Sequence, residues 1–238
     1  MTDPIAVKSQ RRTARIIGFL YLILAICSGF AFFVRSNLIV ANDAIATVNN
    51  IKVSESLFRI SIVSSLIGQI IFLFLVYALY EFLKSVDKKQ SRLMVILVVA
   101  SVPIACLNML NQFATILVLS GAGYLAAFNL SQLQALAMMF LDMQQYGFSI
   151  AQIFWGLWLF PLGILVFKSG FIPKVLGVLL MVGCFGYLIK CLVIIFFPSY
   201  KVITSPGIAI SAIAELSFIF WLLFKGVTVQ KPDTKNVI

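Results

Sequence analysis

The residues most capable of chemistry in this chain are a lysine and a glutamate inside long apolar stretches, Lys190 and Glu215. A charged side chain in the hydrocarbon layer costs on the order of 3 kcal/mol or more, so it usually faces the protein interior and a partner. The helical rise places the two backbones within about 6 Å in depth, a difference that a lysine side chain can span. The sequence therefore predicts a Lys190–Glu215 ion pair between the last two apolar stretches.

Side-chain amides recur in the other apolar stretches. Asn111 and Gln112 follow Asn108 at spacings of three and four, so the three share one stripe of a helix. Amides in such positions hydrogen-bond between helices or line a polar cavity. With one arginine and the two charged residues they define a candidate ligand-binding set: Arg59, Gln69, Asn108, Asn111, Gln112, Gln152, Lys190 and Glu215. For Arg59 we expect pairing with Glu55 or with Asp142.

Three interpretations of these polar faces are open: contacts that hold helices together, a polar cavity for a small ligand or ion, and catalysis. Catalysis ranks last because the chain has no histidine and only one deep carboxylate, so neither a Ser-His-Asp triad nor a carboxylate pair is available. No catalytic residue is predicted. The four cysteines lie in apolar stretches without metal-ligand spacing, so no metal or cofactor is predicted either.

The elements that must position these residues are membrane helices. The chain is 62% hydrophobic and 11% charged, far from the averages of soluble domains. About 20 apolar residues cross the hydrocarbon layer as a helix. The sequence predicts an all-α, polytopic bundle in a single membrane domain, 1–238. Its six spans are expected at about 16–34, 59–83, 93–119, 148–167, 175–197 and 207–225.

The distribution of basic residues predicts the orientation. The formal net charge is +10, but the basic residues cluster at the ends of spans, which fits anionic lipid headgroups rather than nucleic acid. Thirteen of the 18 lysines and arginines fall on the side of the two tails, and four, including Arg35, fall on the other side. We therefore expect the tails 1–15 and 226–238 to be cytoplasmic, in a bacterial inner membrane.

Two segments on the outer side are too long for plain turns. In 36–56, Asn42-Asp43 predicts the start of a short helix. The segment 131–146 reads as a partly amphipathic helix, and we expect a break near Gly147, with a surface-lying or re-entrant helix as the alternative.

Bends are expected at Pro103 and Pro161. The tyrosines and tryptophans of the spans are expected to face lipid or the interface: Tyr21, Tyr77, Tyr80, Trp155, Trp158 and Trp221.

An ordered set of short motifs resembles a known family. The motifs are Arg11-Arg12 with Ala14-Arg15, Gly18 and Tyr21-Leu22; Asn50-Ile51 with Phe58-Arg59; Leu79-Tyr80; Ser169-Gly170-Phe171-Ile172-Pro173-Lys174-Val175-Leu176-Gly177; and Glu215 with Leu222 and Lys225-Gly226. Over roughly 11–226 the chain resembles the bacterial membrane proteins grouped as domain of unknown function 4386. The resemblance implies a multi-span membrane protein and supplies no catalytic or binding residues.

The sequence thus leads to a first hypothesis, a membrane protein that binds, senses or passes a small ligand through a polar interior. One alternative is a structural or accessory subunit that acts through a protein partner. The least favoured alternative is a lipid-modifying intramembrane enzyme. The first two differ in whether Asn108, Gln112, Lys190 and Glu215 converge on one cavity.

Overall fold

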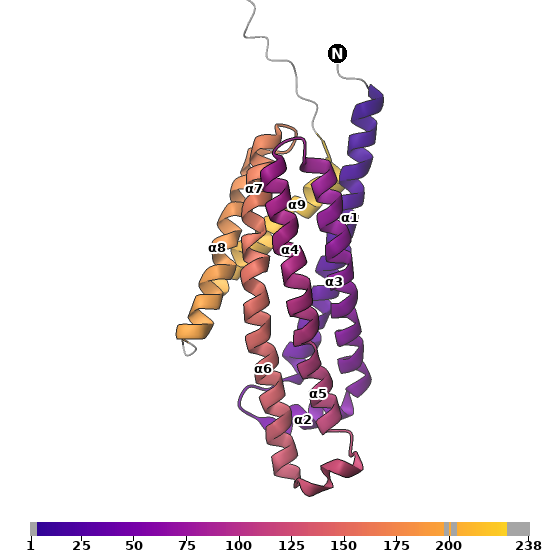
Figure 1. The fold of residues 1–238 in the computed structure, drawn as a ribbon, viewed down its shortest axis with the longest axis vertical. Helices are drawn as coiled ribbons and strands as arrows, with labels where there is room; N and C mark the ends of the chain where they lie inside the picture. Colours follow the sequence, from indigo (N-terminus) through magenta and orange to yellow (C-terminus); the bar gives the residue numbers. More distant parts are fainter. Residues whose placement is uncertain (1–3, 198–199, 201–203, 228–238) are drawn as a thin grey trace, which may run out of the picture.

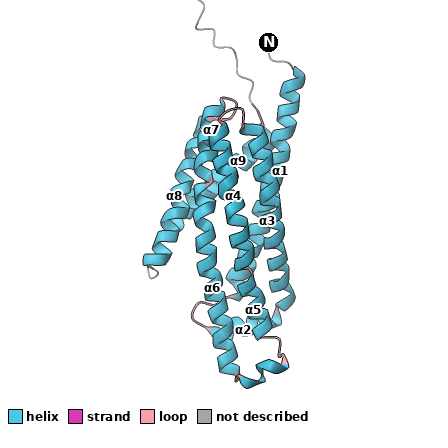
Figure 2. Ribbon diagram, in the orientation of Figure 1, coloured by secondary structure: helices cyan, strands magenta, loops and turns pink. Residues whose placement is uncertain are grey.

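A computed structural model of the chain describes residues 4–197, 200 and 204–227, and all regular secondary structure in these residues is helical (Figure 2). Nearly all of it belongs to long helices that run side by side along one axis (Figure 1). The helices are α1 (Pro4–Leu38), α2 (Ala44–Val53), α3 (Glu55–Leu83), α4 (Lys88–Asn108), α5 (Leu110–Val118), the 3-10 helix η1 (Gly123–Ala127), α6 (Leu130–Leu157), α7 (Leu159–Ser169), α8 (Lys174–Phe196) and α9 (Ser205–Phe224).

Six of the described helical segments are long and apolar enough to cross a bilayer, which confirms the predicted fold class. Two of the six are composite: α4 and α5 form one span, and α6 and α7 form another. The spans are Ser9–Leu38, Glu55–Leu83, Lys88–Val118, Leu130–Ser169, Lys174–Phe196 and Ser205–Phe224. The large apolar side chains exposed along them suit contact with lipid. The protein is therefore an all-α, multi-pass membrane protein.

The spans form a closed ring. Neighbours pack in the order α1, α3, α4, α6, α8 and α9, and α9 then returns to pack against α1. The two ends of the described chain meet at one end of this ring, where the Arg11 side chain donates to the carbonyl of Val227. We call this the inner end, after the predicted orientation, and the opposite end, which holds α2 and η1, the outer end (Figure 1). Of the predicted tail 226–238, residues 228–238 lie outside the described residues.

Small residues allow two of the close contacts in the ring. At the contact between α7 and α8, a Cβ built on Gly163 would stand 2.6 Å from the carbonyl oxygen of Gly177, and one built on Gly177 would stand 2.6 Å from that of Gly163. Between α8 and α9, the Ser211 hydroxyl donates to the Gly183 carbonyl at 2.6 Å. A tight turn joins α7 to α8, in which Gly170 adopts φ 73° after α7 and Pro173 immediately precedes α8.

The outer end corrects one prediction. The short helix α2 begins as expected, with the Asp43 side chain accepting a hydrogen bond from the Ala46 backbone. The expected break at Gly147 is wrong, because α6 runs through it without interruption. The glycine instead makes room for a neighbour, since a Cβ there would overlap the side chain of Asn108. The segment 131–146 therefore continues the fourth span past the level where α8 ends (Figure 1).

The helix interruptions lie close to one proline and away from the other. Regular helix is interrupted at Trp158, three residues before Pro161, where the missing N–H of proline leaves the Leu157 carbonyl without its helical donor. The helix α4 continues through Pro103, and the interruption of that span falls at Met109.

Candidate functional site

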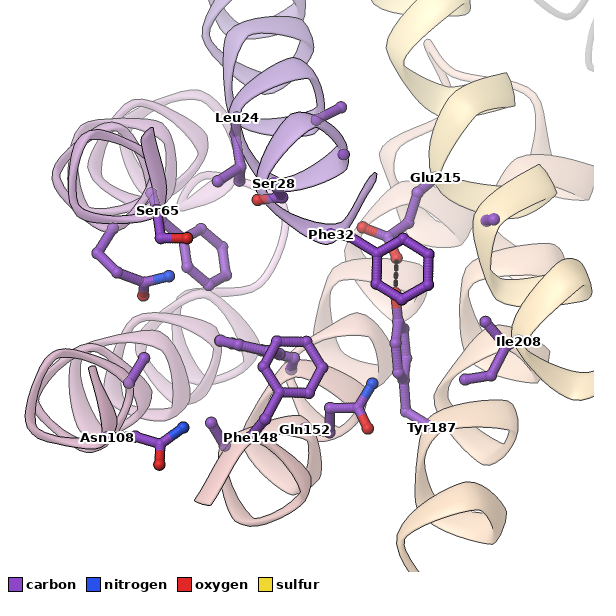
Figure 3. Close-up of a pocket in the computed structure, with 18 of the residues that line it drawn as sticks. Leu24, Ser28, Phe32, Ser65, Asn108, Phe148, Gln152, Tyr187, Ile208 and Glu215 are labelled. Atoms are coloured by element: carbon purple, nitrogen blue, oxygen red, sulfur yellow. Dashed lines mark hydrogen bonds between the residues drawn. The ribbon is translucent and has the colours of Figure 1, made fainter. Parts of the chain in front are cut away.

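A cavity of about 480 Å³ lies inside the ring of spans, in its outer half, and each of the six spans contributes to its wall. Figure 3 shows side chains from several helices directed toward it. Its inner side is closed by a packed core in which Leu79, Met94, Leu162 and Leu222 are fully buried. The polar and charged residues in the wall are Tyr21, Ser28, Arg35, Ser65, Gln69, Asn108, Gln112, Gln144, Gln152, Tyr187, Lys190 and Glu215.

Glu215 is held by two tyrosines. The Tyr21 hydroxyl of α1 donates to Oε2 of Glu215 at 2.6 Å, and the Tyr187 hydroxyl of α8 donates to Oε1 at 2.8 Å, the bond drawn in Figure 3. Both carboxyl oxygens thus have a donor, from two different helices. This pair of bonds joins three spans at the inner side of the cavity.

Lys190 takes no part in that arrangement, and the predicted Lys190–Glu215 ion pair is wrong. Lys190 lines the same cavity but makes no hydrogen bond or ion pair with any described residue. The physical reason is that Tyr187, one turn before Lys190 on α8, reaches the carboxylate with its hydroxyl. The lysine is left as a partly buried cation without a counter-ion among the residues that the structure places.

Arg35 is a second cation in the wall. The charge count assigned it to the outer surface, but it belongs to the last turn of α1 and lines the cavity. One guanidinium nitrogen lies 3.4 Å from the hydroxyl oxygen of Ser65, and the guanidinium carbon lies 5.8 Å from the centre of the Phe148 ring. Within the described part of the chain, no carboxylate lies within ion-pair distance of Arg35.

Aromatic rings form much of the remaining wall. Trp158 packs against Tyr21 at a ring distance of 5.8 Å and against Phe72 at 5.0 Å, while Trp155 packs against Phe148 at 5.0 Å. Tyr21 and Trp158 are each only 2% exposed, so the expectation that they face lipid is wrong. They are buried because the ring of spans closes around them.

Buried amides in the wall lack partners. No hydrogen bond reaches Gln69 Oε1, either polar atom of the Gln112 amide or Gln152 Oε1, and the indole nitrogen of Trp155 is unpaired as well. Leaving a buried polar atom unpaired costs about 1–3 kcal/mol. Since all four side chains line one cavity, these atoms are available to whatever fills it.

The structure brings six of the eight predicted site residues to this cavity: Gln69, Asn108, Gln112, Gln152, Lys190 and Glu215. Asn111 stands beside them and donates to Asn108, whose own amide donates to the Gln144 carbonyl at 2.9 Å. Arg59 lies apart, on the exposed outer surface, and pairs with Glu55 at 2.7 Å, one of its two expected partners. The ligand-binding role of these residues stays a prediction.

Sequence reasoning did not select Arg35, Tyr21 and Tyr187 for the site. Their spacing carries a signal, because Tyr21, Ser28 and Arg35 follow one another at intervals of seven and therefore share one face of α1. Tyr187 precedes Lys190 by three positions and shares its face in the same way. A search for polar side chains at helical spacing would have found these residues with the amides.

Among the described residues, no group of three or more histidines, cysteines or acids could hold a metal ion.

One relative and one family model are similar to this chain. An uncharacterized protein of the archaeon Archaeoglobus fulgidus is 42% identical over 77 residues, which cover 32% of this chain and 44% of that relative. The expectation of a bacterial source stays a prediction. No solved structure matches the chain. The sequence model of the domain of unknown function DUF4386 matches residues 16–226. The chain belongs to this family of unknown function.

Proposed function

We propose that this protein binds a small ligand in the cavity inside its six-span ring, in a cytoplasmic membrane with both tails on the cytoplasmic side. The observation that carries the proposal is the convergence of polar groups on one cavity: the cations Arg35 and Lys190, which have no counter-ion among the described residues, and amide atoms of Gln69, Gln112 and Gln152 that no hydrogen bond reaches. A cavity of 300–1,000 Å³ with a few convergent polar groups is typical of small-ligand sites.

Helix-to-helix adhesion accounts for this pattern less well. Side chains that hold membrane helices together satisfy one another across the interface. Asn108 does so, because it donates to the backbone of α6. The buried amide of Gln112 makes no such bond through either of its polar atoms. Retaining unpaired groups in a membrane interior costs stability, and a ligand that uses them explains why the chain carries them.

The closed inner side favours binding over open passage. Beyond Glu215 the bundle is packed with fully buried side chains such as Leu162 and Leu222. A ligand in the cavity would therefore stop at the Tyr21–Glu215–Tyr187 contact. We assign the basic clusters at the inner end, including Lys88, Lys89 and Arg92, to anionic lipid headgroups of the cytoplasmic leaflet.

A cavity-filling variant tests the proposal. Gly29 lines the cavity, and a Cβ built there meets no atom within 4 Å, so Gly29→Phe adds a ring with no clash at its first carbon. The control is Ile26→Phe on the same helix, because Ile26 is 61% exposed and does not line the cavity. Wild type and both variants are purified in nanodiscs, and retained small molecules are identified by mass spectrometry. We expect a molecule that is present in wild type and Ile26→Phe and absent from Gly29→Phe. Equal retention by all three proteins, or none in any, would refute the proposal.

A further inference from the structure

The proposed function does not specify the chemical class of the ligand. The charged residues in the cavity wall indicate which charge its polar part carries. The carboxylate of Glu215 already accepts hydrogen bonds on both oxygens from Tyr21 and Tyr187. Among the wall residues that the structure describes, the charged groups without an ion-pair partner are therefore Arg35 and Lys190. A guanidinium has five donors and an ammonium three, and charge-assisted bonds to carboxylate or phosphate oxygens are the strongest that either makes. The polar part of the ligand that fits these two residues is an anion.

The rest of the wall calls for an apolar body. Phenylalanine and tryptophan rings from three helices line the space between Glu215 at one end of the cavity and Arg35 at the other. Figure 3 shows Phe148 directed into this space. The length of this apolar stretch follows from α6. Trp158 packs against Tyr21 near Glu215, and Phe148 packs against Arg35. Trp158 follows Phe148 by ten positions, which span about 15 Å along a helix. An elongated hydrocarbon portion fits this space.

The cavity also opens sideways, between α1 and α9. These helices meet closely near the inner end, where a Cβ on Gly18 would stand 3.0 Å from atoms of Leu222 and Leu223. Toward the outer end α9 packs on α8 instead, with Ser211 against Gly183. Where the two helices have parted, the exposed side chains of Phe32 on α1 (63%) and Leu216 on α9 (43%) belong to the wall of the cavity. Both lie within membrane spans, so the opening faces lipid.

From these three observations we infer that the ligand is an amphipathic anion, an acidic head on a hydrocarbon tail, which enters from the lipid layer between α1 and α9. The head binds Arg35 and Lys190, and the tail lies along the rings of Phe148, Trp155 and Trp158. A free fatty acid and a singly acylated phosphate share this chemistry. The inference rests on the proposed function, since it requires that the cavity bind a ligand.

The two cavity tryptophans provide the readout. The chain has three tryptophans, and Trp221 does not line the cavity. In a Trp221→Phe background the fluorescence comes from Trp155 and Trp158, and bromine quenches it on contact. The protein is placed in phosphatidylcholine nanodiscs and titrated with four probes that share one tail: ω-bromododecanoate, ω-bromododecyl phosphate, ω-bromododecanol and ω-bromododecyltrimethylammonium. Inorganic phosphate serves as a competitor that has the charge without the tail.

We expect saturable quenching by at least one of the two anionic probes, and the comparison between them separates a carboxylate head from a phosphate head. Arg35→Gln and Lys190→Gln should each weaken that binding roughly tenfold or more, since each removes a charge-assisted bond. Gly29→Phe should abolish it and Ile26→Phe should not. Inorganic phosphate at equal concentration should not displace the probe. The two glutamine variants should melt no lower than the parent, because a cation without a counter-ion in the membrane costs stability. This measurement separates lost binding from lost folding.

Two results would overturn the inference, in different ways. Saturable quenching by the alcohol or the ammonium probe as strong as by the anions, still abolished by Gly29→Phe, would refute the anionic class and leave the proposed function intact. Failure of all four probes to saturate the quenching would refute the amphipathic anion. Combined with purified protein that carries no retained molecule, that failure would also refute the proposed function.

Discussion

Tyr21 and Glu215 lie 194 positions apart in the chain, and a 2.6 Å hydrogen bond joins their side chains inside the bundle. The bond connects the first span to the last. Tyr187 completes it from the neighbouring span, so three helices share one carboxylate. Because Tyr21 is buried and Tyr187 and Glu215 are half-buried, the arrangement contributes to the stability of the bundle and also forms one wall of the cavity.

Removing the carboxylate should therefore destabilise the protein more than removing one tyrosine hydroxyl. Glu215→Ala leaves the buried hydroxyl of Tyr21 and the half-buried hydroxyl of Tyr187 without an acceptor, at about 1–3 kcal/mol each, whereas Tyr21→Phe removes one donor and leaves Glu215 its bond to Tyr187. We expect Glu215→Ala to cost roughly 3 kcal/mol and Tyr21→Phe about 1 kcal/mol in free energy of unfolding. The measurement is denaturant unfolding in detergent micelles.

Tyr77→Phe is the matched control for that series, since Tyr77 is 64% exposed. It should leave stability unchanged. A double-mutant cycle between Tyr21→Phe and Glu215→Ala should show coupling of at least about 0.5 kcal/mol, as expected for groups in contact. Additive effects in this cycle would contradict the contact.

The reciprocal glycine contact between α7 and α8 predicts a second effect. In Gly163→Ala and in Gly177→Ala the new methyl group would stand 2.6 Å from a backbone carbonyl oxygen, which cannot rotate away. The helices must then separate, and we expect a loss of about 1–3 kcal/mol for each variant. Gly29→Ala is the control, because its methyl group meets no atom within 4 Å and alanine favours the helix by up to about 1 kcal/mol over glycine. The measurement is thermal unfolding. If Gly29→Ala lowered the melting temperature as much as Gly163→Ala and Gly177→Ala, the close contact between α7 and α8 would be refuted.

A pH effect is expected at the inner end. Asp87 lies in the loop before α4, where its side chain forms an ion pair with Lys168 at 2.9 Å and accepts hydrogen bonds from the backbone of Lys89 and Gln90. The bond from Lys168, followed by the backbone bond from Gln90, lowers the pKa of Asp87 below its ordinary value. A carboxylate with a lowered pKa in the folded state stabilises the protein above its unfolded pKa, and that contribution is lost as the pH falls through the folded pKa.

The measurement is the melting temperature of wild type and Asp87→Asn between about pH 6 and pH 3, the range in which an aspartate titrates. Asparagine also caps helices well, so the variant keeps the cap and loses the titrating group. Wild type should melt higher near pH 6, and the difference should shrink below about pH 4. A difference that stayed constant over this range would show that the pair does not stabilise the fold.

The orientation predicted from the basic residues can be tested with two reporters. Green fluorescent protein fused after the last residue, Ile238, should fluoresce, because it folds in the cytoplasm. Alkaline phosphatase inserted after Ser120, in the loop before η1, should be active, because it folds outside. The reverse pattern would invert the assignment of inner and outer ends while leaving the fold unchanged.

The six spans were predictable because a segment that crosses the hydrocarbon layer must be largely apolar and must satisfy its own backbone hydrogen bonds as a helix. Hydropathy along the sequence is therefore enough to identify such segments. Contacts between spans follow a different rule. The prediction that Glu215 lies inside the bundle is confirmed, but its partners depend on which residues of distant helices face it. Lys190 was predicted as the partner because its estimated depth in the membrane matched that of Glu215. The observed partner Tyr21 lies 194 positions away in the chain, so no local sequence pattern connects it to Glu215.

Gly147 shows the same limit at one residue. A glycine between a polar segment and an apolar one predicts a helix break when only the chain nearby is considered. In the fold the residue is glycine because Asn108 of another span occupies the place of its side chain. Six of the candidate site residues nevertheless line one cavity. Polar side chains in membrane spans usually face the interior of the bundle, because exposing them to lipid is costly.

The ring of spans closes between its first and last members, and this has a consequence for biosynthesis. The ribosome delivers α1 to the membrane long before α9 has been made, so the face of α1 that carries Gly18 and Tyr21 must wait for its final neighbour until translation is nearly complete. Until then α1 can pack on α3, α2 and the fourth span, and the insertion machinery or surrounding lipid must cover the face that α9 will later cover. A chain that stops short of α9 would leave that face uncovered, which makes it a natural target for membrane quality-control proteases.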